Sequence, residues 1–554
     1  MPNCKNCQKE FTIYPQDKEF YQRIDVPEPT WCPPCREMRR MAWCNEGILY
    51  PRKCDLCSKS IISEFSSNNP RKVYCLQCWW EDSWEPLNYG KEIDFSRSIL
   101  GQIHELDLIV PHQCVSGDSR SINSDYTHHA GLDKNCYMLF HADYNEDCYY
   151  GYGVKKSKDS MDIYNCFDSE LCYECVDIHD CYHLAWSQDC IKCANSYFLR
   201  DCAGCNDCFL CVGLRQKNYC FLNKQLSEKD YQEKLKETNI GSHRQIKEIW
   251  DKYLKLQKNH IWRYAQSNKV QNSSGNYLYN SFNVQSCFDC SEIESSGYCS
   301  QLSYKSKDCF DVYQFGLNAE LVYEGAMIGE DTNRVLFSYN CIRKVANLNY
   351  CIECYSTKDS FGSVGLRKRE FCILNKKYKE QEYKQLRDKI IDKMKSTGEY
   401  GEFFPINHSP FGYNETIAQL WFPLTKEQTL AKGWSWQDNL PGTYGKETIR
   451  LEQLSDDIKE ILADITQEIL ACENCHKNYK IIAQELDFYK KNNYPLPKKC
   501  FECRRLARMK LRNPRRLYNR TCMNPGCKNK FETTYAPDRE EKVYCEECYQ
   551  KEIY

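Results

Sequence analysis

Sixteen cysteines fall into four sets of two close pairs, a spacing typical of tetrahedral metal sites. The sets are Cys4, Cys7, Cys32 and Cys35; Cys54, Cys57, Cys75 and Cys78; Cys472, Cys475, Cys500 and Cys503; and Cys522, Cys527, Cys545 and Cys548. Each close pair can hold one face of a Zn²⁺ ion, and the second pair closes the other face. Four thiolates leave no position for a water molecule. We therefore expect about four structural zinc ions per chain rather than catalytic ones.

The two ends of the chain repeat one module. Adding 468 to the first set of cysteines gives the third set, and the same shift places Arg36 on Arg504. It places Cys44 on an arginine, so Cys44 is not expected to be a ligand. The stretches 36–43 and 504–511 contain neither Gly nor Pro and are predicted to be helical. A cysteine knuckle, a hairpin and a helix that begins at the second cysteine pair predict twin treble-clef or zinc-ribbon modules.

Positive charge gathers on the C-terminal module. Residues 498–520 contain ten Lys or Arg and only Glu502 as an acid, whereas the whole chain has a formal net charge of −2. Arginine suits phosphate recognition, so we predict that this module contacts RNA or DNA. The predicted contact residues are Arg504, Arg505, Arg508, Arg512, Arg515, Arg516 and Arg520. A charge run can also be only a solvated face, and that alternative stays open.

The middle of the chain carries cysteines separated by multiples of three. They are Cys136, Cys148, Cys166, Cys172, Cys175, Cys181, Cys190, Cys193, Cys202, Cys205, Cys208, Cys211 and Cys220. A period of three matches neither a helix nor a lone strand, and it predicts a β-solenoid with small residues stacked inward. We expect coils of about 18 residues or slightly more. A second copy follows, because 155–164 matches 304–313 and 212–224 matches 364–376.

Three interpretations compete for these thiols. They are a buried ladder of free cysteines, a set of disulfides, or an Fe–S cluster at Cys202, Cys205, Cys208 and Cys211. The ladder is favoured, because the triplet phase extends far beyond those four residues and their spacing departs from that of bacterial ferredoxins. Thiolate zinc sites in the same chain argue against disulfides. Histidines could join cysteines at further zinc sites, although no spacing requires it: His128, His129, His141, His179 and His183.

Helical segments and an aromatic connector join these parts. We expect helices over 227–236 and 377–395 that cap the solenoid copies, and an amphipathic helix in the insert between the copies. A further helix is predicted over 454–470, directly before the third cysteine set. The segment 399–440 is dense in Pro, Gly and aromatic residues, and we expect it to cover a neighbouring surface.

The predicted fold is multidomain and mainly β with short helices, with twin zinc modules at both ends of a duplicated, cysteine-rich β-solenoid. The predicted boundaries are 1–88 for the N-terminal zinc module, 112–225 for the first solenoid copy, 226–270 for a helical insert, 271–376 for the second copy, 377–398 for a capping helix, 399–453 for the connector, and 454–554 for a helix plus the C-terminal zinc module.

Composition narrows the expected location. The chain has 554 residues and 39 cysteines. No apolar run approaches the roughly 18 residues of a membrane helix, so no membrane partner is expected. The first residues lack the charged and then apolar pattern of a signal peptide. We therefore expect a cytoplasmic protein whose cysteines stay reduced.

Several motifs resemble one protein family. The connector EFFPINHSPFGYNETIAQLWFPLTKEQTLAKGWSW, the module PLPKKCFECRRLARMKLRNPRRLY and the N-terminal VPEPTWCPPCREMRR are similar to zinc-ribbon, cysteine-rich proteins of Candidate Phyla Radiation (Patescibacteria) bacteria. The resemblance covers nearly the whole chain. It implies a bacterial, cytosolic protein and supports zinc at the sixteen cysteines, but it implies no mechanism.

The leading functional hypothesis is a non-enzymatic, multi-zinc protein that contacts nucleic acid through its C-terminal module. The first alternative is an assembly scaffold whose solenoid binds a protein partner or a second copy of the chain. The second alternative is a redox or metal-handling protein that uses the cysteine ladder. The sequence contains no Gly-rich phosphate loop, nucleophile elbow or His-Glu metal helix, so hydrolase or transferase activity is not expected.

Overall fold

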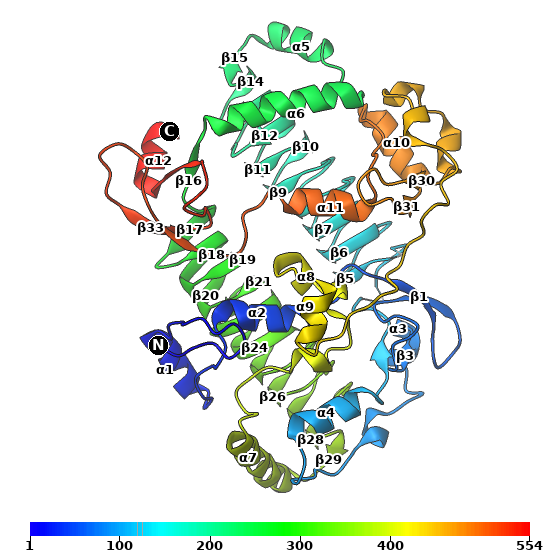
Figure 1. Cartoon of the computed structure of the whole chain (residues 1–554), viewed down its shortest axis with the longest axis vertical. Helices are drawn as coiled ribbons and strands as arrows, with labels where there is room; N and C mark the ends of the chain where they lie inside the picture. The colour runs from blue at the N-terminus through cyan, green and yellow to red at the C-terminus, as the bar shows by residue number, and fades with distance from the viewer. Residues whose placement is uncertain (119, 125, 554) are drawn as a thin grey trace.

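The structure is a computed structural model, and it describes residues 1–118, 120–124 and 126–553. The described residues are mainly β, with short helices around two long stacks of parallel strands (Figure 1). The cysteine sets lie in the modules at the two ends of the chain, as expected.

The first stack contains the strands between residues 128 and 225. Its strands are β5 (His128–Gly131), β6 (Tyr137–Asp143), β7 (Tyr149–Lys155), β8 (Tyr164–Phe167), β9 (Val176–His179), β10 (Tyr182–Ala185), β11 (Gln188–Ile191), β12 (Ala194–Arg200), β13 (Asn206–Val212), β14 (Asn218–Phe221) and β15 (Lys224–Gln225). Neighbours pair in parallel until the last pair, β14 with β15, which is antiparallel and ends the stack.

The second stack contains the strands between residues 267 and 377. Its strands are β17 (Ser267–Gln271), β18 (Gly275–Gln285), β19 (Cys287–Ser291), β20 (Ile293–Gly297), β21 (Ser300–Ser303), β22 (Ser306–Lys307), β23 (Cys309–Gly316), β24 (Glu320–Gly329), β25 (Asn333–Leu336), β26 (Ala346–Asn349), β27 (Lys358–Phe361), β28 (Glu370–Ile373) and β29 (Lys376–Lys377). It ends in the same way, with β28 antiparallel to β29.

Each coil of the first stack takes twelve residues, not the longer coil expected. Tyr137 pairs with Tyr149, and Tyr164 pairs with Val176. Every third residue from Asn123 to Leu222 has a positive φ near 50–70°, so the chain turns a corner after every three residues. Asn, Asp and Gly adopt this conformation most readily, which explains why Asp or Asn so often precedes an inward cysteine.

The second stack contains one-residue insertions at a corner of successive coils. Two consecutive residues have positive φ at Tyr304–Lys305, Leu317–Asn318, Glu330–Asp331 and Arg343–Lys344. The strand register there is thirteen, as in the pairing of Cys309 with Val322, and it returns to twelve after β26. These insertions explain the change of phase that separates Cys309 and later cysteines from Cys299.

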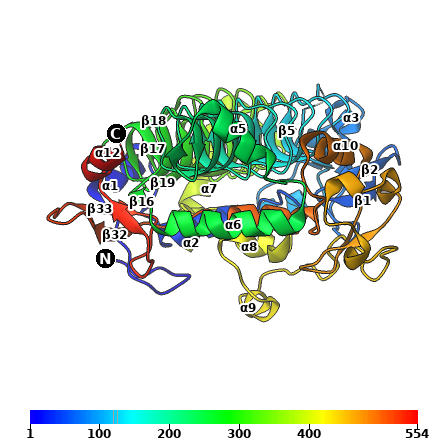
Figure 2. The same cartoon turned by 90° about the horizontal axis from the view of Figure 1, so that it is seen from above.

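Helices cover the stacks mainly on one side. The helices are α1 (Pro15–Arg23), α2 (Pro33–Met41), α3 (Leu76–Trp80), α4 (Ile99–Asp107), α5 (Glu228–Lys236), α6 (His243–Lys258), α7 (Glu380–Thr397), α8 (Ala418–Trp421), α9 (Lys426–Ala431), α10 (Ala483–Asn492), α11 (Phe501–Met509) and α12 (Glu546–Ile553). Figure 2 shows the stacks as one layer, with α2, α6 and α8 in a second layer beside them. The structure thus has two layers around a shared interface.

The expected helices occur with one exception. Ser227 caps α5, Gly398 ends α7 in a left-handed conformation, and α6 buries Ile249 and Tyr253 against the first stack. The helix predicted over 454–470 is wrong. That segment forms short 3-10 turns, because its apolar residues pack on α6 and α10 from an irregular backbone.

The connector packs its aromatic side chains into the core, as expected. Phe403 and Phe404 lie against Trp43, and Tyr413 stacks on Trp434. In the described residues, no helix is both long and apolar enough to span a membrane.

Candidate metal centres

Four groups of cysteine thiols have the geometry of tetrahedral metal sites. In each group all four Sγ atoms lie within 4.8 Å of one another. Sγ–Sγ contacts between the pairs measure 3.7 Å for Cys7–Cys32 and for Cys475–Cys500, and 3.9 Å for Cys57–Cys75 and for Cys527–Cys545. A Zn–S bond of about 2.3 Å gives a tetrahedron with edges of about 3.8 Å. The thiols therefore fit a zinc ion.

The remaining ligands are Cys4 and Cys35 in the first group, Cys54 and Cys78 in the second, Cys472 and Cys503 in the third, and Cys522 and Cys548 in the fourth. The second cysteine pair of three groups begins a helix, as expected: Cys32, Cys75 and Cys500 are the N-cap residues of α2, α3 and α11. Cys44 belongs to none of the groups.

Hydrogen-bond donors point at the sulfurs of these groups. The backbone N–H of Cys32 donates to Cys4 Sγ at 3.2 Å, and Asn6 Nδ2 donates to Cys35 Sγ at 3.2 Å. Donors of this kind stabilise a thiolate, which is the form that binds a metal. The contact between the Cys32 and Cys35 side chains lowers the pKa of Cys32 and raises that of Cys35, as two thiols that share one proton do.

The coil cysteines have the opposite environment. Cys202 Sγ lies 3.4 Å from the carbonyl oxygen of Arg200 and 3.7 Å from that of Cys211. Ser160 occupies an equivalent inward position and donates to the carbonyl of Lys158 at 2.8 Å. A carbonyl oxygen accepts a hydrogen bond from a protonated thiol and repels a thiolate. Burial also raises the pKa of Cys202 well above its ordinary value.

This contrast favours the buried ladder over an Fe–S cluster. Cys202, Cys205, Cys208 and Cys211 fill the four inward positions of one coil, and each Sγ contacts the carbonyl two residues before it. They are not among the groups of close potential ligands in the described part of the chain. All the coil cysteines are buried and unpaired with one another as disulfides.

A fifth cluster, Glu64 with His128 and His129, does not suit a metal. His128 Nδ1 accepts from the backbone N–H of Ser116 at 3.1 Å, and its Nε2 lies 2.9 Å from the carbonyl oxygen of Asn45. Both ring nitrogens of His128 are therefore occupied by the backbone. The cluster fixes the position of Asn45 instead of holding an ion.

The helix α11 directs its arginines into the first stack. Arg504 Nε and Arg508 Nη2 lie 3.1 Å and 2.9 Å from the same atom, Asp162 Oδ1. Arg512 Nε lies 2.8 Å from Asp177 Oδ2, and Arg515 contacts a carboxylate of the second stack. Arg505 is also buried, with its guanidinium beside Gly47.

The prediction that these five arginines form an exposed phosphate-binding face is therefore wrong. Acidic side chains of the coils pair with four of them, whose side chains are at most 5% exposed, and Arg505 is buried beside Gly47. Arg516 remains exposed and lies over the Tyr518 ring, while Arg520 is half-buried and reaches the carbonyl of Ala536. Two partly accessible arginines do not make the predicted patch.

The N-terminal module docks on the second stack in the same manner. Arg36 Nη2 lies 2.8 Å from Asp311 Oδ2, and Arg40 Nη2 lies 3.2 Å from Asp311 Oδ1. Arg40 also contacts Glu324 at 3.1 Å, as Arg508 contacts Glu174 at 3.2 Å. The two modules are related by a shift of 468 residues and the two stacks by an internal repeat. Both module–stack interfaces therefore contain the same arrangement of ion pairs. Each module docks on the stack that is more distant in sequence.

No model of a known protein family matches this chain, and no curated protein matches it either.

Proposed function

We propose that this protein is a zinc-dependent binding scaffold, in which four structural zinc ions hold two modules that clamp two β-solenoids. One observation carries the proposal. Asp162 and Asp311 each form ion pairs with two arginines of one helix, and that helix begins at a cysteine pair. A helix of nine residues is marginal alone, so the metal at its N-terminus would hold it in place. Zinc would then determine whether the arginines reach their carboxylates.

Contacts of each module with both stacks support a clamp. In the N-terminal module, β3 (Val73–Tyr74) pairs with β4 (His112–Gln113) just before the first stack, while α2 docks on the second. In the C-terminal module, β34 (Lys542–Tyr544) pairs with β16 (Ile261–Arg263) just before the second stack, while α11 docks on the first. Loss of either module would loosen both stacks.

The chemistry of the thiols favours binding over catalysis or redox transfer. A metal closed by four thiolates has no open position for a substrate. The coil thiols are buried, which keeps them away from substrates and oxidants and makes them poor nucleophiles. The function would then reside in the surfaces that the zinc ions assemble.

Metal analysis combined with hydrogen exchange tests the proposal. Elemental analysis of the purified full chain should give four zinc ions, one for each cysteine group. Chelation should then remove the exchange protection of α2 and α11 together with that of the stack strands beneath them. Cys500→Ser should lower the zinc content by one and deprotect α11, whereas the coil variant Cys205→Ser should leave both unchanged. Iron in place of zinc, or full protection of α11 after chelation, would overturn the proposal.

A further inference from the structure

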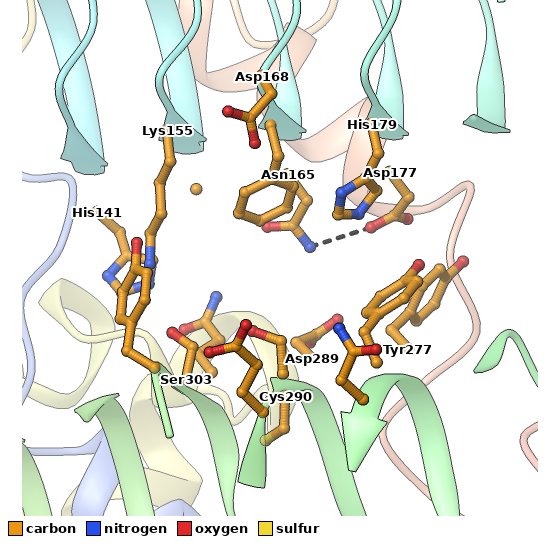
Figure 3. A pocket seen from close by; sticks show the side chains of 18 of the residues that line it. His141, Lys155, Asn165, Asp168, Asp177, His179, Tyr277, Asp289, Cys290 and Ser303 are labelled. Atoms are coloured by element: carbon orange, nitrogen blue, oxygen red, sulfur yellow. Dashed lines mark hydrogen bonds between the residues drawn. The ribbon is translucent and has the colours of Figure 1, made fainter. Parts of the chain in front are cut away.

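The two stacks meet along a polar seam that contains a cavity of about 340 Å³. Strands β6–β9 form one wall, and β18, β19 and β21 form the other, with side chains from both walls pointing into the space (Figure 3). This volume lies within the range of small-molecule sites, about 300–1,000 Å³. None of the sixteen cysteines of the metal centres lines the cavity.

The floor of the cavity is built from buried, fixed polar groups. Asn165 Nδ2 donates to Asp177 Oδ1 at 3.0 Å, and Arg512 holds the other oxygen of Asp177. Arg515 Nη2 lies 2.8 Å from Asp289 Oδ2. These contacts balance the floor charges and hold the side chains in one arrangement, so a ligand would meet a site that is already formed.

Other groups at the cavity keep their hydrogen-bonding capacity. Within the described residues, His141 and His179 have no hydrogen-bond partner for their rings, and burial lowers the pKa of His179 to about 4. Neutral imidazoles each supply one donor and one acceptor. Asp168 and Glu292 are exposed carboxylates without an ion pair in the same described part of the chain. Lys155 also lines the cavity, with Nζ 4.6 Å from the Tyr304 ring centre.

We propose that this cavity binds an uncharged, polyhydroxylated ligand, namely a small sugar. Free carboxylates disfavour a phosphorylated ligand, and Lys155 with Lys156 disfavours a polyamine. A hydroxyl group both donates and accepts, so it satisfies carboxylates, imidazoles and ammonium groups alike. Phe167 and His179, whose ring centres are 4.7 Å apart, both line the cavity and supply apolar ring surface for the C–H groups of a sugar.

A neighbouring cavity of about 100 Å³ gives the site a second part. His141 lines both cavities, so they adjoin along the seam. Both ring nitrogens of His129 and Oδ1 of Asn340 are buried there without a partner in the described residues. Unpartnered buried groups are costly, and the hydroxyls of a second sugar ring would satisfy them. The site therefore suits a disaccharide better than a single sugar.

Binding to the zinc-loaded full chain tests the proposal. Glucose, cellobiose and maltose serve as probes in saturation-transfer NMR and calorimetry, with glucose 6-phosphate and spermidine as charged comparators. We expect a disaccharide to bind more tightly than glucose and than either charged compound. Its affinity should stay constant between about 50 and about 500 mM NaCl, because no net charge is screened.

A matched pair of variants tests whether the ligand binds in this cavity. Asp168 lines the cavity and Asp159 does not, and both have left-handed backbone, with φ of 49° and 48°, which Asn also tolerates. Asp168→Asn should weaken sugar binding about tenfold through loss of a charged acceptor, and Asp159→Asn should not. The proposal is overturned if no sugar binds at about 20 mM, if a charged comparator binds best, or if the two variants weaken binding equally.

Discussion

Asp162→Asn tests most directly how the C-terminal module docks. Asp162 is fully buried; its Oδ1 accepts a hydrogen bond from Arg504 Nε at 3.1 Å and forms an ion pair with Arg508 Nη2 at 2.9 Å. Asparagine keeps the shape but removes the charge, so the two buried arginines keep only Glu485 and Glu174 as acidic partners. Breaking a buried ion pair costs about 3–5 kcal/mol. Because each arginine retains a second carboxylate, we expect the lower end of that range, about 3 kcal/mol.

Hydrogen exchange measured by mass spectrometry reports this docking directly. A loss of about 3 kcal/mol is a change of roughly 150-fold in the docking equilibrium. The amides of α11 should therefore exchange about 100-fold faster, while the zinc content stays unchanged. Asp311→Asn is the matched variant, because Asp311 forms the corresponding ion pairs with Arg36 and Arg40. It should deprotect α2 and leave α11 as it was.

Unchanged protection of α11 in Asp162→Asn would refute the reasoning, because the buried charges would then contribute nothing to docking. Asp159→Asn removes a carboxylate from the same coil that, within the described residues, has no ion pair with α2 or α11, and it should alter neither helix. The two modules touch where Arg505 lies beside Gly47 and Arg515 lies near Glu37, so the departure from additivity in the double variant measures the coupling between them.

Three further outcomes follow from the thiols and from one buried histidine. A thiol reagent should label few cysteines in the zinc-loaded protein, about sixteen after chelation and all 39 after unfolding, as counted by mass spectrometry. Cys205→Ser should cost less than about 1 kcal/mol in denaturant unfolding, because serine at other inward positions makes the same contact with a carbonyl. Burial lowers the pKa of His112, but the carboxylates of Glu353 and Asp107 outweigh it and raise the pKa to about 9. Stability from this group is thus complete below pH ~6.5 and is lost as the pH rises through about 9, a loss that His112→Gln should abolish in pH-dependent melting.

The local patterns of the sequence predicted the four cysteine groups well, because a cysteine knuckle is a short-range feature. The four groups and the helices α2 and α11 begin where the cysteine pairs place them. The length of the coil was harder to predict. Cysteine occupies only some of the inward positions, with Leu, Val and Ser at the others, so the expected coil length reflected where cysteines occur and not where the backbone completes a turn.

The role of the arginines depended on a long-range match that no window of sequence contains. Asp162 and Asp311 lie in the repeated segments 155–164 and 304–313, and Arg504 and Arg36 lie in the repeated modules. Both the aspartate of the stack and the arginine of the module are therefore present in each copy, which indicates that they form an ion pair. The sequence alone could not predict which module docks on which stack, because the arginines of either module could pair with the aspartate of either stack. Packing of the chain decided it.

The crossed docking has a consequence for synthesis on the ribosome. Asp162 and its coil are made long before Arg504, so the C-terminal module meets a finished partner as soon as it appears. Arg36 is made 275 residues before Asp311, which at synthesis rates of about 5–20 residues per second leaves it without its partner for roughly 15 to 55 s. During that interval the nascent chain displays an uncompensated basic helix, and any acidic surface nearby can compete for it. The two ends of one protein, built from the same module, thus face different risks of misassembly.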